Sequence, residues 1–230
     1  MMEPLEPAVL ERLRTINTPT IANAIEVFDV RPRNEGFMRP EIRCIFPNLG
    51  VMVGYAVTLK IQSISPGAKG AAIYPSEHWK DILKIPAPRV VVVEDLDDPP
   101  GLGSLWGEVN ANMHRAMGCV GCVTNGSVRD LDEVEPLGFH FFAGHIAVSH
   151  AYVHIVEVGK PVRVGGLTVR PGDLLHGDRH GVTSIPLDLA ARIPEGAKTV
   201  DTMERQIINY SQSPEFTVEG LTTLWNRLRP

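Results

Sequence analysis

The fold is decided by one stretch, residues 101–133, which reads GLGSLWGEVNANMHRAMGCVGCVTNGSVRDLDE. Residues 108–117 place apolar side chains at helical spacing, and residues 120–124 (VGCVT) form a short apolar run typical of a buried strand. We interpret Asn125-Gly126 as a turn that delivers Arg129 and Asp130 beyond the end of that strand. A helix and a strand therefore separate Glu108 from the Arg-Asp pair, which predicts a crevice where the two carboxylates meet.

Strands and helices alternate before this stretch. The β-rich segment Val51–Ile61 and the four-valine run Val90–Val93 are predicted strands. Thr18 and Pro19 have the residue types of an N-cap and a first helical position, so we expect a helix to begin there.

Short strands dominate the second half of the chain. Residues 161–170 (PVRVGGLTVR) alternate on both sides of Gly165-Gly166 and predict a hairpin. Asp201–Glu204 resembles a capping box, so we expect a helix to begin there, with a last amphipathic helix near the C-terminus. Together these patterns predict one mixed α/β domain over residues 1–230, ending in a helical extension over about residues 195–230.

The overall composition restricts the kind of partner. Of the residues, 43% are hydrophobic and 21% charged, and the net charge is −5 with no basic cluster. We therefore expect no nucleic-acid partner. No apolar run reaches the ~18 residues of a membrane span, and the acidic N-terminal segment has no secretory pattern, so we expect no membrane association and a cytoplasmic protein.

The strongest chemical candidate is Glu108 together with Arg129 and Asp130. Asp supplies a hard oxygen ligand suited to Mg²⁺ or Mn²⁺, and Arg supplies a planar cation for a carboxylate or an enolate oxygen. Gly107 and the backbone N–H groups after it, at a helix start, would bind an anion. An ordinary surface ion pair is the alternative reading of the same residues.

Three other motifs are given structural interpretations. Gly101 and Gly103 fit a dinucleotide loop poorly, because the next glycine comes one residue late and Glu108 follows it. The Cys119/Cys122 pair follows a helix C-terminus, where the helix dipole opposes a reactive thiolate, so we expect two small buried residues. The HGDRH segment at residues 176–180 is interpreted as a turn with a metal-binding strand face as its alternative.

The central segment GEVNANMHRAMGCVGCVTNGSVRDLDEV (residues 107–134) closely resembles the signature of the RraA-like family. That family includes class II 4-hydroxy-4-methyl-2-oxoglutarate aldolases and RraA regulators of ribonuclease E activity. The resemblance extends to Thr18–Ala24, Val53–Thr58 and Val162–Pro186, and covers about residues 18–192. It departs from the common pattern at Glu108 and Asn125, where Asp is usual, and this leaves the preferred substrate open.

The resemblance implies an α/β/α arrangement around a β-sandwich-like core, assembled as a homotrimer or homohexamer with active sites between subunits. By the resemblance, Asp130 would bind the divalent cation and Arg129 would hold the keto or enolate oxygen of a 2-oxo acid. The loop of Gly107, Glu108, Val109 and Asn110 would bind the substrate carboxylate, with Glu108 reaching the metal through water.

Two functions follow from the resemblance. The first is a metal-dependent lyase that cleaves 4-hydroxy-2-oxo acids to pyruvate and decarboxylates oxaloacetate, since both reactions pass through pyruvate enolate. The second is a non-catalytic regulator that binds an enzyme of RNA degradation. Metal-dependent pyruvate release would distinguish them.

Overall fold

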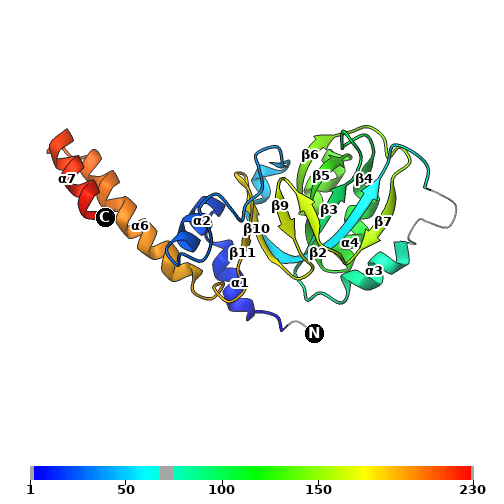
Figure 1. Cartoon of the computed structure of the whole chain (residues 1–230), viewed down its shortest axis with the longest axis horizontal. Helices are drawn as coiled ribbons and strands as arrows, with labels where there is room; N and C mark the ends of the chain where they lie inside the picture. Colours follow the sequence, from blue (N-terminus) through cyan, green and yellow to red (C-terminus); the bar gives the residue numbers. More distant parts are fainter. Residues whose placement is uncertain (1–2, 68–74, 229–230) are drawn as a thin grey trace.

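The computed structural model describes residues 3–67 and 75–228 as a curved mixed sheet with helices around it (Figure 1). The helices are α1 (Pro7–Arg14), α2 (Thr18–Glu26), α3 (Pro75–Ile82), α4 (Glu108–Ala116), α5 (Leu131–Val134), α6 (Ile193–Ser211) and α7 (Val218–Leu228), with 3₁₀ turns at Pro47–Leu49 and Glu135–Leu137. The strands are β1 (Arg43–Cys44), β2 (Met52–Gln62), β3 (Arg89–Asp95), β4 (Ser104–Trp106), β5 (Cys119–Val128), β6 (His140–Ile146), β7 (His154–Val158), β8 (Val162–Val164), β9 (Leu167–Val169), β10 (Leu174–Asp178) and β11 (Gly181–Ile185).

Nine strands form the main sheet, in the order β1-β6-β5-β3-β2-β10-β11, with β4 added to β5 and β7 added to β2. The four central strands β2, β3, β5 and β6 are parallel, and β4 is parallel to β5. The segment before β1 bonds to β11 through the Phe37–Thr183 bridge, whereas β1 itself pairs with β6. One short segment thus connects the two ends of the sheet and gives it a nearly closed, barrel-like form.

Both faces of the central strands are covered. On one face, alternate apolar residues of β2, β3, β5 and β6 pack against Ile82, Ala111 and Val134 of α3, α4 and α5. On the other face, Val90 and Val92 pack against the two-stranded β8–β9 sheet. This second layer of strands agrees with the expected sandwich-like core, and burial on two faces explains why the Val90–Val93 run is continuously apolar.

The remaining helices lie at the β10–β11 end of the sheet. The helices α1, α2 and α6 share a cluster with Tyr55, Leu174 and Ile185. Only the first half of α6 contributes buried residues, and α7 has none. The second half of α6 and all of α7 extend away from the sheet, as Figure 1 shows.

The helix predicted to begin at Thr18 is confirmed, but its N-cap differs, and a second predicted helix start is wrong. The N-cap of α2 is Asn17, whose side chain accepts from the Thr20 N–H, whereas the Thr18 hydroxyl is bonded to Nδ1 of His176. Residues 201–204 are not a capping box but the middle of α6, where the Thr202 hydroxyl donates to the Lys198 carbonyl. Pro194 in the first turn of α6 marks the true start.

The predicted turn at Asn125-Gly126 is also wrong. Both residues lie inside β5, at a register shift relative to β6 between Thr124 and Ser127. The Asn125 side chain accepts from the Asp95 N–H at 2.8 Å and donates to the Asp95 carbonyl at 2.9 Å. Because its amide replaces a missing ladder pair, β5 continues through the irregularity to Val128.

Candidate active site

The candidate site lies where β4 and β5 end side by side. Trp106 pairs with Val128, and both strands run in the same direction, so the residues that follow them emerge at one edge of the sheet. Gly107 begins the connection to α4, and Arg129 begins the connection to α5. The Arg129 N–H donates to the Trp106 carbonyl at 3.1 Å, which holds the two connections together.

Asp130 joins the two connections directly. Its Oδ2 accepts the backbone N–H of Glu108 at 3.0 Å. The prediction that the two carboxylates meet is not confirmed: the contact joins the Glu108 backbone N–H to the Asp130 carboxylate, and the Glu108 side chain is exposed. A carboxylate at this end of α4 is favourable because helix N-terminal N–H groups lack intrahelical partners and carry partial positive charge.

Gly107 is required for this approach. Its φ is −163°, an extended value open to any residue, so backbone strain does not select glycine here. An added Cβ would instead overlap the Asp130 carboxylate and lie 3.3 Å from Cγ of Arg129. Glycine at position 107 lets the start of α4 close on the Arg-Asp pair.

Asp130 adopts a left-handed backbone conformation, with φ 56° and ψ 48°. Asp and Asn tolerate this region better than most residues do. Its Oδ1 lies 3.7 Å from Nε of Arg129, and the two side chains are 34% and 36% exposed. The carboxylate is thus held between a backbone N–H and a guanidinium while remaining accessible to a ligand.

The predicted anion-binding loop is only partly available. The Glu108 N–H is occupied by Asp130, and the Asn110 side chain donates to the Leu105 carbonyl at 2.6 Å. The backbone N–H groups of Val109 and Asn110 belong to the first turn, which has no intrahelical acceptors. The Val109 side chain is 70% exposed and has no polar atom, so only the backbone N–H of this residue can bind an anion.

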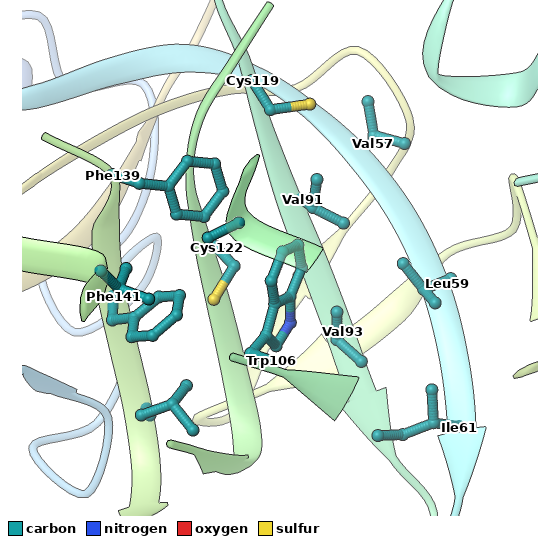
Figure 2. Close-up of a cluster of buried hydrophobic side chains, with 14 of the residues drawn as sticks. Val57, Leu59, Ile61, Val91, Val93, Trp106, Cys119, Cys122, Phe139 and Phe141 are labelled. Carbon is teal, nitrogen blue, oxygen red and sulfur yellow. The ribbon is translucent and has the colours of Figure 1, made fainter. Parts of the chain in front are cut away.

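Ser104 and Trp106 support the site from below, and the sequence interpretation missed both. The Ser104 hydroxyl lies 2.6 Å from the Trp106 carbonyl and 2.8 Å from the Ser127 carbonyl, bridging β4 and β5. Trp106 is 1% exposed and packs near Phe139 and Phe141, as Figure 2 shows. Trp106, a large aromatic residue directly before Gly107, is the sequence signal that could have identified this support of the site.

Two buried acids fix the loop that leads into β4, and they too were missed. Oδ2 of Asp97 accepts from the Ser63 N–H, the Ser63 hydroxyl and the Ile64 N–H. Asp95 accepts from the N–H groups of Asp97 and Gly101, and burial raises the pKa of its carboxyl. These acids serve the chain's own backbone and position β4.

The two remaining motifs have structural roles. Burial raises the pKa of Cys119 to about 12 and that of Cys122 well above the usual thiol value, so neither thiol is reactive. His176 is fully buried in β10, between the Thr18 hydroxyl and the Leu13 carbonyl. Across residues 3–67 and 75–228, no cluster of three or more His, Cys, Asp or Glu side chains is arranged to hold a metal ion.

Comparison with known proteins gives the family. The RraA-like (Aldolase/RraA) family model matches residues 18–183, and the chain belongs to this family. A Halalkalibacterium halodurans protein named as a putative 4-hydroxy-4-methyl-2-oxoglutarate aldolase is 26% identical over 203 residues, which span 86% of this chain and 85% of that protein. The family resemblance inferred from residues 107–134 is thereby confirmed.

Solved structures share the fold. An uncharacterised protein from Pseudomonas syringae superposes with a TM-score of 0.73 at 24% identity, covering 97% of this chain and 96% of that one. RraAS2 from Streptomyces coelicolor, described as an unusual member of the RNase ES inhibitor RraA family, gives 0.67 at 20% identity, covering 89% and 98%. The family thus contains relatives named as an aldolase and as an inhibitor.

In the described part of this chain, no helix has the length and apolar character to cross a membrane.

Proposed function

We propose that this protein is a divalent-metal-dependent carbon–carbon lyase. Its substrates would be 4-hydroxy-2-oxo acids of the 4-hydroxy-4-methyl-2-oxoglutarate type, cleaved to pyruvate, with oxaloacetate decarboxylation as a second activity. The observation that carries the proposal is the accessible Asp130 carboxylate, held between the start of α4 and the Arg129 guanidinium.

The donor set fits Mg²⁺ or Mn²⁺. Mg²⁺ keeps several waters and is commonly bound through one or two protein carboxylates plus substrate oxygens, so a cage of three protein ligands is unnecessary. Asp130 would supply the direct carboxylate, and Glu108, exposed beside it, would contact the ion through water. When bound, the cation would supply Lewis acidity toward the keto oxygen of the substrate.

Each residue of the site has a role in this chemistry. Arg129 would stabilise the negative charge that develops on the keto oxygen as the carbon–carbon bond breaks to give pyruvate enolate. The N–H groups of Val109 and Asn110, after Gly107, would bind the substrate carboxylate at the positive end of α4. Glu108 would orient a water molecule at the mouth of the site.

The surface around the site supports an oligomer. Ile146 and Val148, which follow β6, are 62% and 97% exposed, and Val109 at the start of α4 is 70% exposed. Backbone bonds from Ala147 to Val128 and from Ser104 to Ser149 place this segment beside the end of β5 and the start of β4. Exposed apolar side chains in one area are typical of an interface, and we propose that a second copy in a homotrimer or homohexamer covers the site. The buried free thiols are compatible with the proposed cytoplasmic location.

A regulatory function is the second candidate, and one observation favours it. Asp130 also satisfies the N-terminus of α4, so the chain would benefit from this residue even without catalysis. A non-catalytic regulator of an RNA-degrading enzyme could therefore keep the same pair.

The test is pyruvate release measured with lactate dehydrogenase and NADH, using oxaloacetate and 4-hydroxy-4-methyl-2-oxoglutarate as separate substrates. We expect turnover with Mg²⁺ and loss of turnover with EDTA. Arg129→Lys keeps the charge but not the guanidinium geometry, and we expect it to lower kcat by about 100-fold. If the folded protein shows no metal-dependent turnover on either substrate, the lyase proposal is wrong and the regulatory function is favoured.

A further inference from the structure

A cavity lies beside α4, and neither Arg129 nor Asp130 lines it. It measures about 330 Å³, at the lower end of the roughly 300–1,000 Å³ range of small-molecule pockets. Its walls come from α3, α4, β4, β7 and the residue before β7, and it is lined by Pro75, His78, Trp79, Leu105, Asn110, Met113, His114, Val153, His154 and Ile155. Among the lining residues that the structure describes, none is Asp, Glu, Lys or Arg, which favours an uncharged occupant.

Two buried histidines form the polar part of this cavity. Nε2 of His78 lies 3.0 Å from Nε2 of His114, and Nδ1 of His114 lies 2.7 Å from the Asn110 carbonyl. A carbonyl only accepts, so Nδ1 of His114 carries the proton and donates. Burial lowers the pKa of His78 to about 3 and that of His114 to about 4, so both rings are neutral at pH 7.

The tautomers follow from these contacts. A neutral His114 protonated at Nδ1 has a lone pair at Nε2, so His78 must donate from its own Nε2. Neutral His78 then has a lone pair at Nδ1, where it can only accept a hydrogen bond. Within residues 3–67 and 75–228 that Nδ1 has no partner, although His78 is only 2% exposed. A buried polar atom without a partner is unfavourable and uncommon.

We propose that this cavity binds a small, uncharged molecule that has one hydroxyl group on an apolar body, such as a phenol or a short alcohol. Nδ1 of His78 is closed to solvent in this structure, so the ring would shift as the hydroxyl donates to it. The apolar part would pack against Trp79, Met113 and Ile155. This site is independent of the proposed lyase activity.

A metal ion is the competing occupant, because two imidazole nitrogens 3.0 Å apart resemble a pair of ligands. His154 also lines the cavity, but the described residues contain no group of three or more His, Cys, Asp or Glu side chains arranged to hold a metal ion, and zinc sites in proteins use three or four protein ligands. In addition, His78 donates to His114 and His114 donates to the Asn110 carbonyl, so both Nε2 atoms are already used in hydrogen bonds. These contacts favour a hydroxyl donor over a cation.

The test uses phenol as the probe and toluene as its matched control, since toluene keeps the ring and lacks the hydroxyl. The chain has three tryptophans, so the three indole N–H signals in a ¹H–¹⁵N spectrum report on separate places. Trp79 lines the cavity, Trp106 lies 4.7 Å from the His114 ring, and Trp225 is in α7. We expect phenol to shift the Trp79 and Trp106 signals saturably and to leave the Trp225 signal in place.

The hydroxyl contact predicts that phenol binds roughly three- to tenfold more tightly than toluene. In His78→Phe this preference should disappear, and in Met113→Trp, which fills the cavity, both probes should fail to bind. Equal affinities of phenol and toluene for the wild-type chain would overturn the proposal, and this comparison needs no variant to fold. Saturable binding of Zn²⁺ without any response to phenol would also overturn it.

Discussion

The backbone N–H of Glu108 donates to Oδ2 of Asp130 across 3.0 Å, and this bond joins the first turn of α4 to the start of α5. The N-cap residue of α4 is Gly107, which has no side chain to cap the helix. Asp130 performs that function from another part of the chain. The same carboxylate therefore contributes to the stability of α4 and to the proposed chemistry, and substitutions can separate the two roles.

Gly107→Ala should disrupt the site. The added Cβ would overlap the Asp130 carboxylate, so Asp130 and the start of α4 must move apart. We expect pyruvate release to fall by about 100-fold and the free energy of unfolding to fall by about 1–3 kcal/mol. Gly138→Ala is the matched control, because φ at Gly138 is 68° with open space around it. It should lose roughly 1 kcal/mol through backbone strain and keep full activity. Equal activity losses in the two variants would contradict this explanation.

Asn125 should contribute to stability through the irregularity in β5. Asn125→Ala removes both side-chain bonds to the backbone of Asp95, so we expect urea unfolding to show a loss of about 1–3 kcal/mol. Asn125→Asp retains an acceptor for the Asp95 N–H but has no donor for the Asp95 carbonyl, and it should be intermediate. A neutral Asn125→Ala variant would mean that this amide does not support the strand.

The differences from the sequence predictions have two causes, long-range contacts and an earlier helix start. Asn125-Gly126 has local turn chemistry, but its amide bonds Asp95, thirty residues away, and that contact keeps the strand intact. The bonds from Ser63 to Asp97 are equally distant in sequence and left no local pattern. Residues 201–204 have the types of a capping box, yet the helix is already established from Ile193.

The successes have a physical basis as well. Val90–Val93 was recognised as a strand because burial on two faces requires a continuous apolar run. The neighbourhood of Glu108 and Asp130 was predicted from the helix and the strand between them. In the structure it arises because β4, which was not predicted, runs parallel to β5 and ends at the same edge. Their contact through the Glu108 backbone could not be inferred, because no side-chain pattern encodes it. The roles of these residues in binding metal and substrate stay predictions.

Acid should destabilise the protein through its buried histidines. Burial is the main cause that lowers the pKa of His78 to about 3 and that of His140 to about 4. Above pH 6.5 both rings are neutral in the folded and unfolded states, so they add no pH dependence. Below pH 6.5 the unfolded chain binds protons that the folded chain excludes, so stability falls from pH 6.5 toward about pH 4. At pH 5, each of these histidines should lower the free energy of unfolding by about 1–2 kcal/mol relative to its value above pH 6.5.

Urea unfolding at pH 7.5 and pH 5.0 measures this effect. His140→Gln removes one buried titrating ring, and its loss of stability between the two pH values should be smaller than that of the wild-type chain. The exposed His150→Gln variant is the control. Identical losses in His140→Gln and the wild type would show that His140 does not resist protonation.

The exposed apolar residues beside the site should hold the proposed oligomer together. Val148 is 97% exposed, and Val148→Asp would place a charge in the interface. Light scattering should give three or six times the chain mass of 25.2 kDa for the wild type and a smaller mass for this variant. Leu83→Asp, 63% exposed on the α3 side, should leave the mass unchanged. A wild-type monomer would contradict the proposed assembly.

The central claim is that the Asp130 carboxylate binds the catalytic cation, and Asp130→Asn tests it most directly. Asn tolerates the left-handed conformation of residue 130 and can still accept the Glu108 N–H, so the fold and the cap should persist. The measurement is Mg²⁺-dependent pyruvate release from oxaloacetate by the wild type and by this variant, each shown to be folded by circular dichroism. We predict turnover by the wild type that EDTA abolishes, and a loss of about 100-fold or more in Asp130→Asn. Turnover near the wild-type rate in the folded Asp130→Asn variant would contradict the account.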